Sequence, residues 1–523
     1  MEQKRYNAPE LLAPVGDMER LISAVRYGAD AVYLAGKSFG MRSAPSNFTN
    51  EELEEAVKYC HAQGVKVYVT CNILPHNAEL AALPAFLEFC QAIGVDAFIM
   101  TDLGVMAMAK KYAPNVAIHI STQAGVVNYE TANAFYNMGA ERVVLARELS
   151  FEEIAEIRAK TPKALEIEAF VHGAMCVSFS GRCLLSNYMT GRDANHGDCA
   201  QPCRWDYYLI ERTRPDQVFT IEQDQKSTYV FNSRDMCMIE HIPQLIECGI
   251  SSLKIEGRAK SAYYVACVTN AYRHGIDAVM NGEPLPQWVV DETEKISHRA
   301  YSTGFYSGHE PGQTVNSGGY IRGWDVAAVC TGEENGMMRL SQRNRFFRGE
   351  TVSVLEPGEV PYDLTLSEIY NEDMEPTESA PHATMTVYLK TDRKIKEGAF
   401  LRVKRGLITP PFRAHTFPIR RCFYVYTQDH RNVCVCDVLS RHRTARHRDR
   451  RFRRHKLYGS RRAAEFIYLN GRQGARHDLR PQFAAAHKRR TCLCRCGNSL
   501  AGNACQIKPR CTGRKTRSPA HGA

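Results

Sequence analysis

The stretch Asn50-Glu-Glu-Leu-Glu-Glu-Ala-Val-Lys-Tyr-Cys-His-Ala-Gln-Gly-Val-Lys-Val-Tyr-Val-Thr-Cys-Asn72 contains one helix–strand unit and sets the pattern for the first half of the chain. Its first part, Asn50–Gln63, has the apolar spacing of an amphipathic helix, and Gly64 is a typical residue just past a helix end. Val65–Asn72 is rich in β-branched and apolar residues, as in a buried strand. The stretch therefore predicts a helix that leads directly into a covered sheet.

Similar units recur through about the first 280 residues. Strands are expected at Glu10–Pro14, Ala31–Ala35, Val65–Asn72, Ala97–Asp102, Ala117–Thr122, Arg142–Arg147, Ala164–Val171 and Ser252–Glu256. Helices are expected at Asp17–Tyr27, Asn50–Gln63, Ala78–Ile93, Gly104–Tyr112, Tyr129–Met138, Phe151–Lys160, Asp235–Cys248 and Ala262–Ala278. Apolar strands that alternate with helices predict an α/β fold with a parallel sheet. Eight such units favour a (β/α)8 TIM-like barrel over residues 8–312, with a doubly wound open sheet as the alternative.

The pattern changes to short alternating strands between residues 313 and 405. Turn residues separate these segments, which predicts a small antiparallel β domain. The expected strands are Val326–Thr331, Met338–Leu340, Glu350–Leu355, Leu364–Ile369 and Thr384–Leu389.

The last part of the chain differs sharply in charge from the rest. Residues 406–523 hold 27 Lys or Arg and 5 Asp or Glu, a net charge of +22, whereas residues 1–405 have a net charge of −12. No helical or strand period is sustained in this Arg/His/Cys-rich tail, so it is expected to be disordered. A basic RNA-binding arm and an out-of-frame or read-through extension are both compatible with its composition.

Composition also limits the class of protein. The apolar fraction of 44% and the charged fraction of 24% are typical of a soluble globular protein. Neither a signal-peptide core nor a long apolar stretch is seen, so we expect a cytoplasmic protein that does not contact the membrane. Disulfides are rare in such a reducing compartment, and clustered cysteines there indicate metal or redox chemistry.

Four cysteines lie close together in the long aperiodic segment 173–232: Cys176, Cys183, Cys199 and Cys203, with the spacing C-x6-C-x15-C-x3-C. This segment leaves the carboxyl end of the seventh strand, where barrels of this kind place their chemistry. Thiolates are soft ligands, and the uneven spacing favours a [4Fe–4S] cluster. A zinc site, or four unrelated thiols, remains an alternative. Seven further cysteines are expected to be small core residues: Cys60, Cys71, Cys90, Cys237, Cys248, Cys267 and Cys330.

The segment from Glu168 to Ser186, which contains the first two of these four cysteines, resembles the signature of peptidase family U32. Other segments that resemble the family are Glu10–Gly16, Ser121–Gln123, Arg142–Glu148, Ser252–Arg258 and Asn316–Trp324. The resemblance covers about residues 8–405. It implies a TIM-like barrel followed by a small β-barrel domain, and the tail beyond residue 405 departs from it.

Despite the family name, the members that this chain resembles are RNA- or quinone-hydroxylating proteins. The resemblance is greatest to the branch that makes 5-hydroxyuridine at the tRNA wobble position, without oxygen and with prephenate. It implies a [4Fe–4S] cluster on Cys176, Cys183, Cys199 and Cys203. It further implies prephenate as co-substrate, the tRNA anticodon loop as partner, and a related U32 protein as a second partner. Ribosomal RNA or a quinone precursor remains an alternative substrate.

Polar residues at the predicted strand ends would face one cavity. Prephenate has two carboxylates, and arginine binds carboxylates bidentately, so Arg42, Arg147 and Arg258 are candidate clamps. The predicted catalytic residues are Glu168, His172, Arg147 and Lys254, and the predicted substrate-binding residues are Arg42, Thr122, Gln123 and Arg258.

Structural roles for some of these residues remain open. Arg147 would then pair with Glu148 or Glu168, and Arg258 with Glu256. His172 is either a proton donor or a residue that holds the loop after its strand.

A peptidase, as the family name suggests, is the alternative enzyme class. The zinc-protease pattern H-E-x-x-H does not occur in the sequence. Gly36-Lys-Ser-Phe-Gly40 matches the G-x-S-x-G pattern, but a nucleophile elbow turns directly into a helix, and here a loop is expected to intervene. A third possibility is a scaffold protein whose cluster is only structural.

Overall fold

The structure is a computed structural model. It describes residues 8–40, 47–176, 178–179, 182–204, 208–210, 218–220, 233–309, 320–405, 422–426 and 432–436. Residues 1–416 form one compact unit and residues 417–523 a second.

Eight parallel strands close into a barrel in the first unit. They are β1 (Glu10–Pro14), β2 (Ala31–Leu34), β3 (Lys66–Cys71), β4 (Ala97–Met100), β5 (Ala117–Ile120), β6 (Arg142–Val144), β7 (Glu166–Ala174) and β11 (Ser252–Ile255). Each pairs with the next, and β11 pairs with both β7 and β1, which closes the ring. The predicted TIM-like barrel is confirmed, and the doubly wound sheet is excluded.

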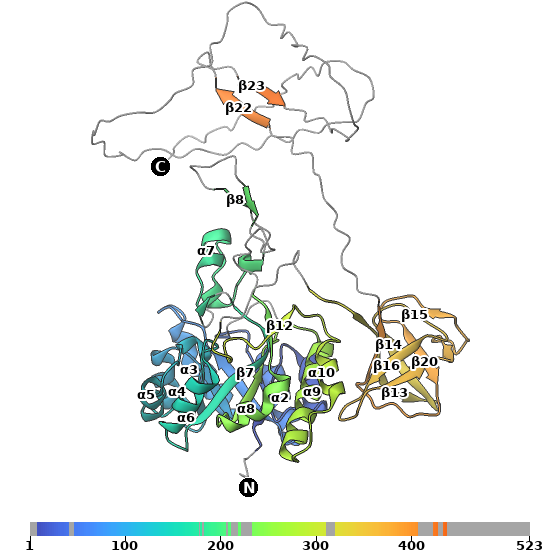
Figure 1. The fold of residues 1–523 in the computed structure, drawn as a ribbon, viewed down its shortest axis with the longest axis horizontal. Coiled ribbons are helices and arrows are strands. Elements are labelled where there is room, and N and C mark those ends of the chain that lie inside the picture. Colours follow the sequence, from blue (N-terminus) through green and yellow to red (C-terminus); the bar gives the residue numbers. More distant parts are fainter. Residues whose placement is uncertain are drawn as a thin grey trace, which may run out of the picture. The chain divides into compact units, whose positions relative to one another are not determined.

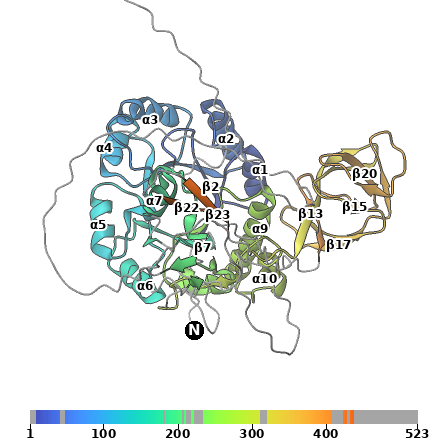
Figure 2. The same ribbon diagram turned by 90° about the horizontal axis from the view of Figure 1, so that it is seen from above.

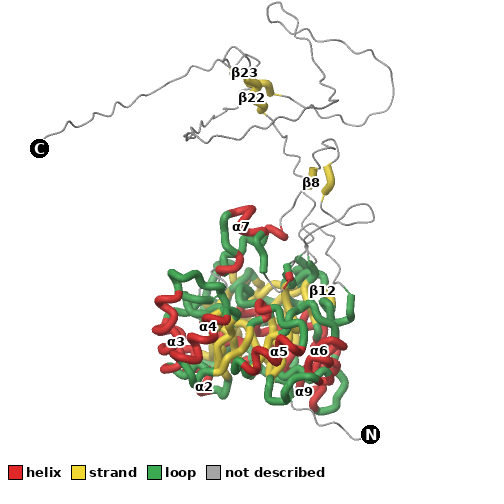
Figure 3. The backbone as a smooth tube through the Cα atoms, turned by 90° about the vertical axis from the view of Figure 1, so that its left-hand side faces the viewer, coloured by secondary structure: helices red, strands yellow, loops and turns green. Residues whose placement is uncertain are grey.

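Helices surround the strands, as Figures 2 and 3 show. They are α1 (Met18–Arg26), α2 (Asn50–Ala62), α3 (Leu83–Ala92), α4 (Leu103–Tyr112), α5 (Tyr129–Asn137), α6 (Phe151–Ala159), α8 (Ile242–Glu247), α9 (Ala262–Met280) and α10 (Gln287–Thr293). Outward-facing strand residues such as Leu11 and Ala13 pack under these helices. A separate apolar cluster fills part of the lumen: Leu12, Ala31, Tyr33, Tyr68, Ala97 and Ile99.

One predicted helix was wrong at its start. Asp235–Cys237 forms a short strand, β10, which pairs antiparallel with the end of β7 and parallel with β12 (Tyr301–Ser302). Strand β7 extends past the barrel to Ala174, and its edge there provides hydrogen-bonding groups that Asp235–Cys237 satisfies. Helical structure begins only at Ile239, where a 3-10 turn leads into α8.

The second part of this unit is a curled antiparallel sheet, in yellow and orange in Figure 1. Its strands follow the order β17-β16-β21-β13-β14-β20-β18. In chain order they are β13 (Trp324–Glu334), β14 (Met337–Gln342), β16 (Thr351–Leu355), β17 (Tyr362–Thr365), β18 (Glu368–Tyr370), β20 (Thr386–Lys390) and β21 (Phe400–Lys404), and β15 (Phe346–Phe347) pairs separately with β19 (Ser379–Ala380). The single strand expected at Leu364–Ile369 is divided between β17 and β18, and β21 was not predicted.

A buried ion pair joins the two parts of the unit. Arg402 of β21 donates to both carboxylate oxygens of Glu292 in α10, at 2.6 and 2.7 Å, and neither side chain is exposed. Tyr27 at the end of α1 donates to the carbonyl of Leu355 in β16 at 2.8 Å. Barrel and β domain are therefore held by specific polar contacts as well as by apolar packing.

The remaining described segments are short. The cysteine-rich segment contains α7 (Leu185–Thr190), and β8 (Tyr208–Ile210) pairs with β9 (Val218–Thr220). In the tail, β22 (Cys422–Tyr426) and β23 (Asn432–Cys436) form an antiparallel hairpin that the sequence analysis did not predict. The other tail residues, on which the prediction of disorder mainly falls, lie outside the described ranges. None of the helices among the described residues is long and apolar enough to span a membrane.

Candidate functional site at the carboxyl end of the barrel

A network of charged side chains lies inside the barrel. Lys254 donates to one carboxylate oxygen of Glu168 at 2.6 Å, and Arg142 donates to the other at 3.0 Å. Arg142 also donates to Glu10 at 2.6 Å and pairs with Glu166 at 2.5 Å. Glu168 has no exposed surface, and Lys254 and Arg142 are buried as well. The structure thus brings two predicted catalytic residues, Glu168 and Lys254, into direct contact.

This network lies toward the amino ends of the strands. Arg142 and Glu10 are the first residues of their strands, and Glu168 is in register with Ser252, the first residue of β11. Burial alone would raise the pKa of the Glu168 carboxyl, but Lys254 and Arg142 outweigh burial and hold that pKa below its usual value. Both carboxylate oxygens of Glu168 accept hydrogen bonds from cationic side chains, which indicates a structural role inside the barrel. The sequence analysis missed Arg142 and Glu10, although both are charged residues in otherwise apolar buried strands.

Arg147 lies at the opposite end, just after β6. Its guanidinium lies 3.8 Å from the ring centre of Phe170 and donates to Glu256 at 3.1 Å and to the carbonyl of Ala174 at 3.0 Å. Its acidic partner is therefore Glu256, and not Glu148 or Glu168. The buried Nε–H group has no hydrogen-bond partner among the residues described.

Arg258 follows β11 and reaches across the same mouth. It donates to the hydroxyl of Thr70 at 3.1 Å and to the side-chain oxygen of Asn47 at 2.9 Å. Glu256, the acidic partner expected as an alternative for Arg258, pairs with Arg147. The Arg258 side chain is 4% exposed, so the two hydrogen bonds fix its position.

Amide and hydroxyl groups complete the mouth. Asn72 donates to the side-chain oxygen of Gln123 at 3.0 Å. Thr122 donates to the carbonyl of Leu145 at 2.9 Å, which engages its hydroxyl proton with the backbone. Thr122 is half-buried and Gln123 is buried. Arg42 lies outside the described residues.

His172 does not join the other predicted site residues. It is buried, and its ring packs against Tyr264 and Tyr272 of α9 and against Tyr301, at centroid distances of 6.0, 5.6 and 5.5 Å. A register shift between Lys254 and Ile255 brings His172 opposite an outward-facing residue of β11. Burial lowers the pKa of His172 to about 3, so the imidazole is neutral at physiological pH.

The cysteine-rich segment begins two residues after β7. Cys176 is exposed there, and Cys183, Cys199 and Cys203 follow within a small folded unit around α7. Figures 1 and 3 show α7 beyond the carboxyl ends of the barrel strands. The backbone of Ala200 donates to the hydroxyl of Ser186 at 3.0 Å, which ties the second half of the unit to α7.

Two of these sulfurs accept backbone hydrogen bonds. The amide of Leu185 donates to Cys183 Sγ at 3.3 Å, and that of Gln201 to Cys199 Sγ at 3.4 Å. In both cases the donor is two residues after the cysteine. Hydrogen bonds to sulfur stabilise thiolate charge and tune iron–sulfur clusters.

Ser38, the serine of the G-x-S-x-G match, does not lie on a nucleophile elbow. Gly36 forms an isolated bridge with Phe48, and helix α2 begins only at Asn50. A catalytic serine of this class needs a helix that starts directly behind it.

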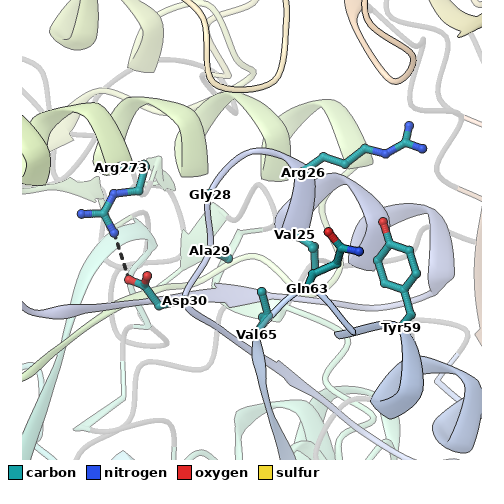
Figure 4. Close-up of a pocket in the computed structure, with 9 residues that line it drawn as sticks. All are labelled: Val25, Arg26, Gly28, Ala29, Asp30, Tyr59, Gln63, Val65 and Arg273. Carbon is teal, nitrogen blue, oxygen red and sulfur yellow. Dashed lines mark hydrogen bonds and ion pairs between the residues drawn. The ribbon is translucent and has the colours of Figure 1, made fainter. Parts of the chain in front are cut away.

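A surface pocket of about 650 Å³ lies at the other end of the barrel (Figure 4). It is lined by residues of the α1–β2 and α2–β3 connections, among them Asp30 and Gln63, and by Arg273 of α9. Asp30 accepts hydrogen bonds from the Leu11 amide at 2.8 Å and from Arg273 at 3.0 Å. These connections mark the amino-terminal face, where such barrels do not place their chemistry. The pocket is therefore not the candidate active site.

Two protein-family models match this chain. The model of peptidase family U32 matches residues 16–316, and that of the peptidase family U32 C-terminal domain matches residues 322–402. The chain belongs to peptidase family U32.

Three relatives illustrate how U32 proteins are named. A protein of Bacillus subtilis named tRNA hydroxylation protein P1 is 38% identical over 409 residues, which cover 75% of this chain and 94% of that protein. The tRNA hydroxylation protein P of Escherichia coli is 35% identical, over 74% of this chain and 95% of its own length. An uncharacterized protease of Methanocaldococcus jannaschii is 44% identical over 57% of this chain and 72% of that protein.

The U32 resemblance implies an iron–sulfur cluster, and the donor chemistry of the segment fits one. Within the described part of the chain, no three His, Cys, Asp or Glu side chains are grouped closely enough to hold one metal ion. Thiolates are ligands both of zinc and of [4Fe–4S] clusters. Three of the cysteines lie in one small unit, and two sulfurs already accept amide hydrogen bonds.

Three cysteines outside the segment, Cys60, Cys90 and Cys237, are unsuited to this chemistry. Burial raises the pKa of the Cys60 and Cys90 thiols to about 12 and that of Cys237 to about 11. A thiol that stays protonated is a poor metal ligand. The prediction that the seven cysteines outside the segment are core residues agrees with their positions, because all are buried or half-buried.

Proposed function

We propose that this protein is an RNA-modifying enzyme that hydroxylates C5 of the wobble uridine of tRNA, without oxygen and with prephenate as co-substrate. The names of its U32 relatives support an RNA hydroxylation role. The observation that carries the proposal is the cysteine-rich unit directly after β7, with amide hydrogen bonds to Cys183 and Cys199. A [4Fe–4S] cluster held by Cys176, Cys183, Cys199 and Cys203 would supply electron transfer or a binding position for an oxygen donor. A cytoplasmic location and a related U32 partner protein belong to the same proposal.

The substrate base would reach the barrel mouth only when unstacked. Anticodon-loop bases are single-stranded, so flipping one out costs less than extracting a paired base. The amides of Asn72 and Gln123 lie at the mouth and can form hydrogen bonds to the edge of a uracil. Arg147 and Arg258 would bind the carboxylates of prephenate.

The overall reaction replaces the hydrogen on C5 with a hydroxyl group. This change removes two electrons from the base, so the reaction needs either a two-electron acceptor together with water, which supplies the oxygen and releases two protons, or a donor of an oxygen atom. Arg147, which pairs with Glu256, would anchor the co-substrate while the base is held by the amides.

Substitution of a single cysteine tests the proposal. A Cys176→Ala variant, purified without oxygen, should lose iron, sulfide and visible absorbance, and 5-hydroxyuridine in tRNA should fall to background in cells that carry it. Cys248→Ala is the matched control, because Cys248 is also partly exposed but lies outside the segment. Normal 5-hydroxyuridine with Cys176→Ala would overturn the assignment. Cleavage of gelatin by the iron-free protein would instead support the peptidase alternative.

A further inference from the structure

A basic, aromatic loop lies between β14 and β16 of the β domain. Residues 343–349 contain three arginines and no acidic residue, within a chain whose first 405 residues have a net charge of −12. Of the two adjacent phenylalanines, Phe346 is fully buried in the domain core, whereas Phe347 is 44% exposed. Arg345 places its guanidinium 5.0 Å from the centre of the Phe347 ring. The surface therefore combines positive charge with an accessible aromatic face.

The backbone of this loop is fixed by hydrogen bonds. The amides of Arg343 and Asn344 donate to the carbonyl of Ala327 at 2.8 and 3.1 Å. The carbonyl of Arg345 accepts from Arg405 at 3.0 Å, and the amide of Phe347 donates to Glu350 at 3.1 Å. A loop held in this way loses little conformational entropy when it binds a ligand.

The arginines remain able to bind an anion. Arg345 forms no ion pair with an acidic residue in the described ranges. Arg343 and Arg348 pair with Glu19 at 3.7 Å and with Glu378 at 3.0 Å, and all four of these side chains are exposed. Exposed pairs of this kind are weak, so a phosphate can compete with the carboxylates.

The contact with Glu19 shows which end of the barrel the loop faces. Glu19 is in the first turn of α1, and α1 starts directly after the carboxyl end of β1. Arg343 therefore reaches the same end of the barrel at which Arg147 and Arg258 lie.

We propose that the loop 343–349 is a second RNA-binding surface, which holds single-stranded RNA beside the barrel mouth. The guanidinium groups would bind backbone phosphates, and a base would stack on the exposed ring of Phe347. This inference rests on the proposed function, because it assumes an RNA substrate. It also accounts for how a body with a net negative charge can bind a polyanion, since binding needs only a local basic surface.

The test is a titration of the full-length holoprotein with unmodified tRNA at several salt concentrations. Arg345→Ala should weaken binding and reduce the slope of log affinity against log salt by about 1, because one phosphate contact is lost. Phe347→Ala should weaken binding about 5- to 150-fold with an unchanged slope, as expected for one lost base stack. Phe347→Tyr should restore it.

Arg393→Ala is the matched control. Arg393 is also an exposed arginine of the β domain over an aromatic ring, 3.3 Å from the centre of Tyr362, but it lies outside the loop. It should leave the affinity and the slope unchanged.

The outcomes separate the two proposals. If the wild type binds and hydroxylates tRNA but Arg345→Ala and Phe347→Ala bind it equally well, the loop is not an RNA surface and the proposed function stands. If the variants change only the mass of the protein assembly, the loop is a protein contact, and the inference is also overturned. If the wild type neither binds nor modifies tRNA, the proposed function itself fails.

Discussion

Replacement of Glu168 by Gln separates a structural from a catalytic role for the lumen network. The change keeps the volume of the side chain and removes its charge. Lys254 then lies buried without its only acidic hydrogen-bond partner in the described structure, whereas Arg142 keeps Glu10 and Glu166. Removal of one partner of a buried pair costs about 3–5 kcal/mol. At about 2–4 °C per kcal/mol, the melting temperature should fall by about 6–20 °C.

Glu166→Gln is the matched control on the same strand. Glu166 also pairs with Arg142, but its side chain is 47% exposed, so loss of its charge should cost less than about 1 kcal/mol. The melting temperatures of both variants are measured by circular dichroism under anaerobic conditions and compared with that of the wild type. Adding Lys254→Met to Glu168→Gln should recover part of the loss, because the uncompensated ammonium is then absent. A Glu168→Gln variant with unchanged melting temperature and no hydroxylation would refute the structural role and make Glu168 catalytic.

Two further predictions concern His172 and Arg402. Because the pKa of His172 is about 3 in the folded protein and about 6.5 when unfolded, the unfolded state gains a proton first as the pH falls, so His172 lowers stability between pH 6.5 and 3. His172→Phe should make the free energy of unfolding, measured by urea titration, less sensitive to pH in this window, by up to about 1.4 kcal/mol per pH unit. It should leave the pH profile of hydroxylation unchanged, and a shifted profile would show that the imidazole takes part in catalysis. Arg402→Met leaves Glu292 buried with Lys295 as its remaining cation, so the melting temperature should fall and proteases should cleave between barrel and β domain at lower concentrations. Wild-type protease resistance in this variant would mean that apolar packing alone joins the two parts.

The barrel could be predicted from the sequence because apolar residues are spaced differently along its strands and its helices. Val65–Asn72 is rich in β-branched and apolar residues, as in a buried strand, and the structure places Lys66–Cys71 in β3. The start of the segment expected as a helix at Asp235–Cys248 could not be predicted in this way. Asp235–Cys237 is extended because the far end of β7 offers it a free edge, and such a partner is visible only in three dimensions.

The position of His172 shows a similar limit for the site. Strand alternation places Glu168, Phe170 and His172 on one face, and the first two do lie with Lys254. The register shift opposite Ile255 breaks the alternation, and His172 packs against α9 instead. A bulge of this kind depends on how two strands meet and leaves no periodic signal in either. Arg147 and Arg258, which follow regular strands, lie at the mouth as expected.

The cysteines show why residue type and context together can indicate chemistry before any geometry is known. A thiol within a helix or strand of the core is desolvated, which raises its pKa and keeps it protonated, as for Cys60 and Cys90. A thiol in a long polar loop keeps access to water, to amide donors and to metal. Cys183 and Cys199 have such amide donors, two residues further along the chain. Because the same loop leaves the carboxyl end of a barrel strand, any cluster bound by these thiolates would lie at the same end of the barrel as Arg147.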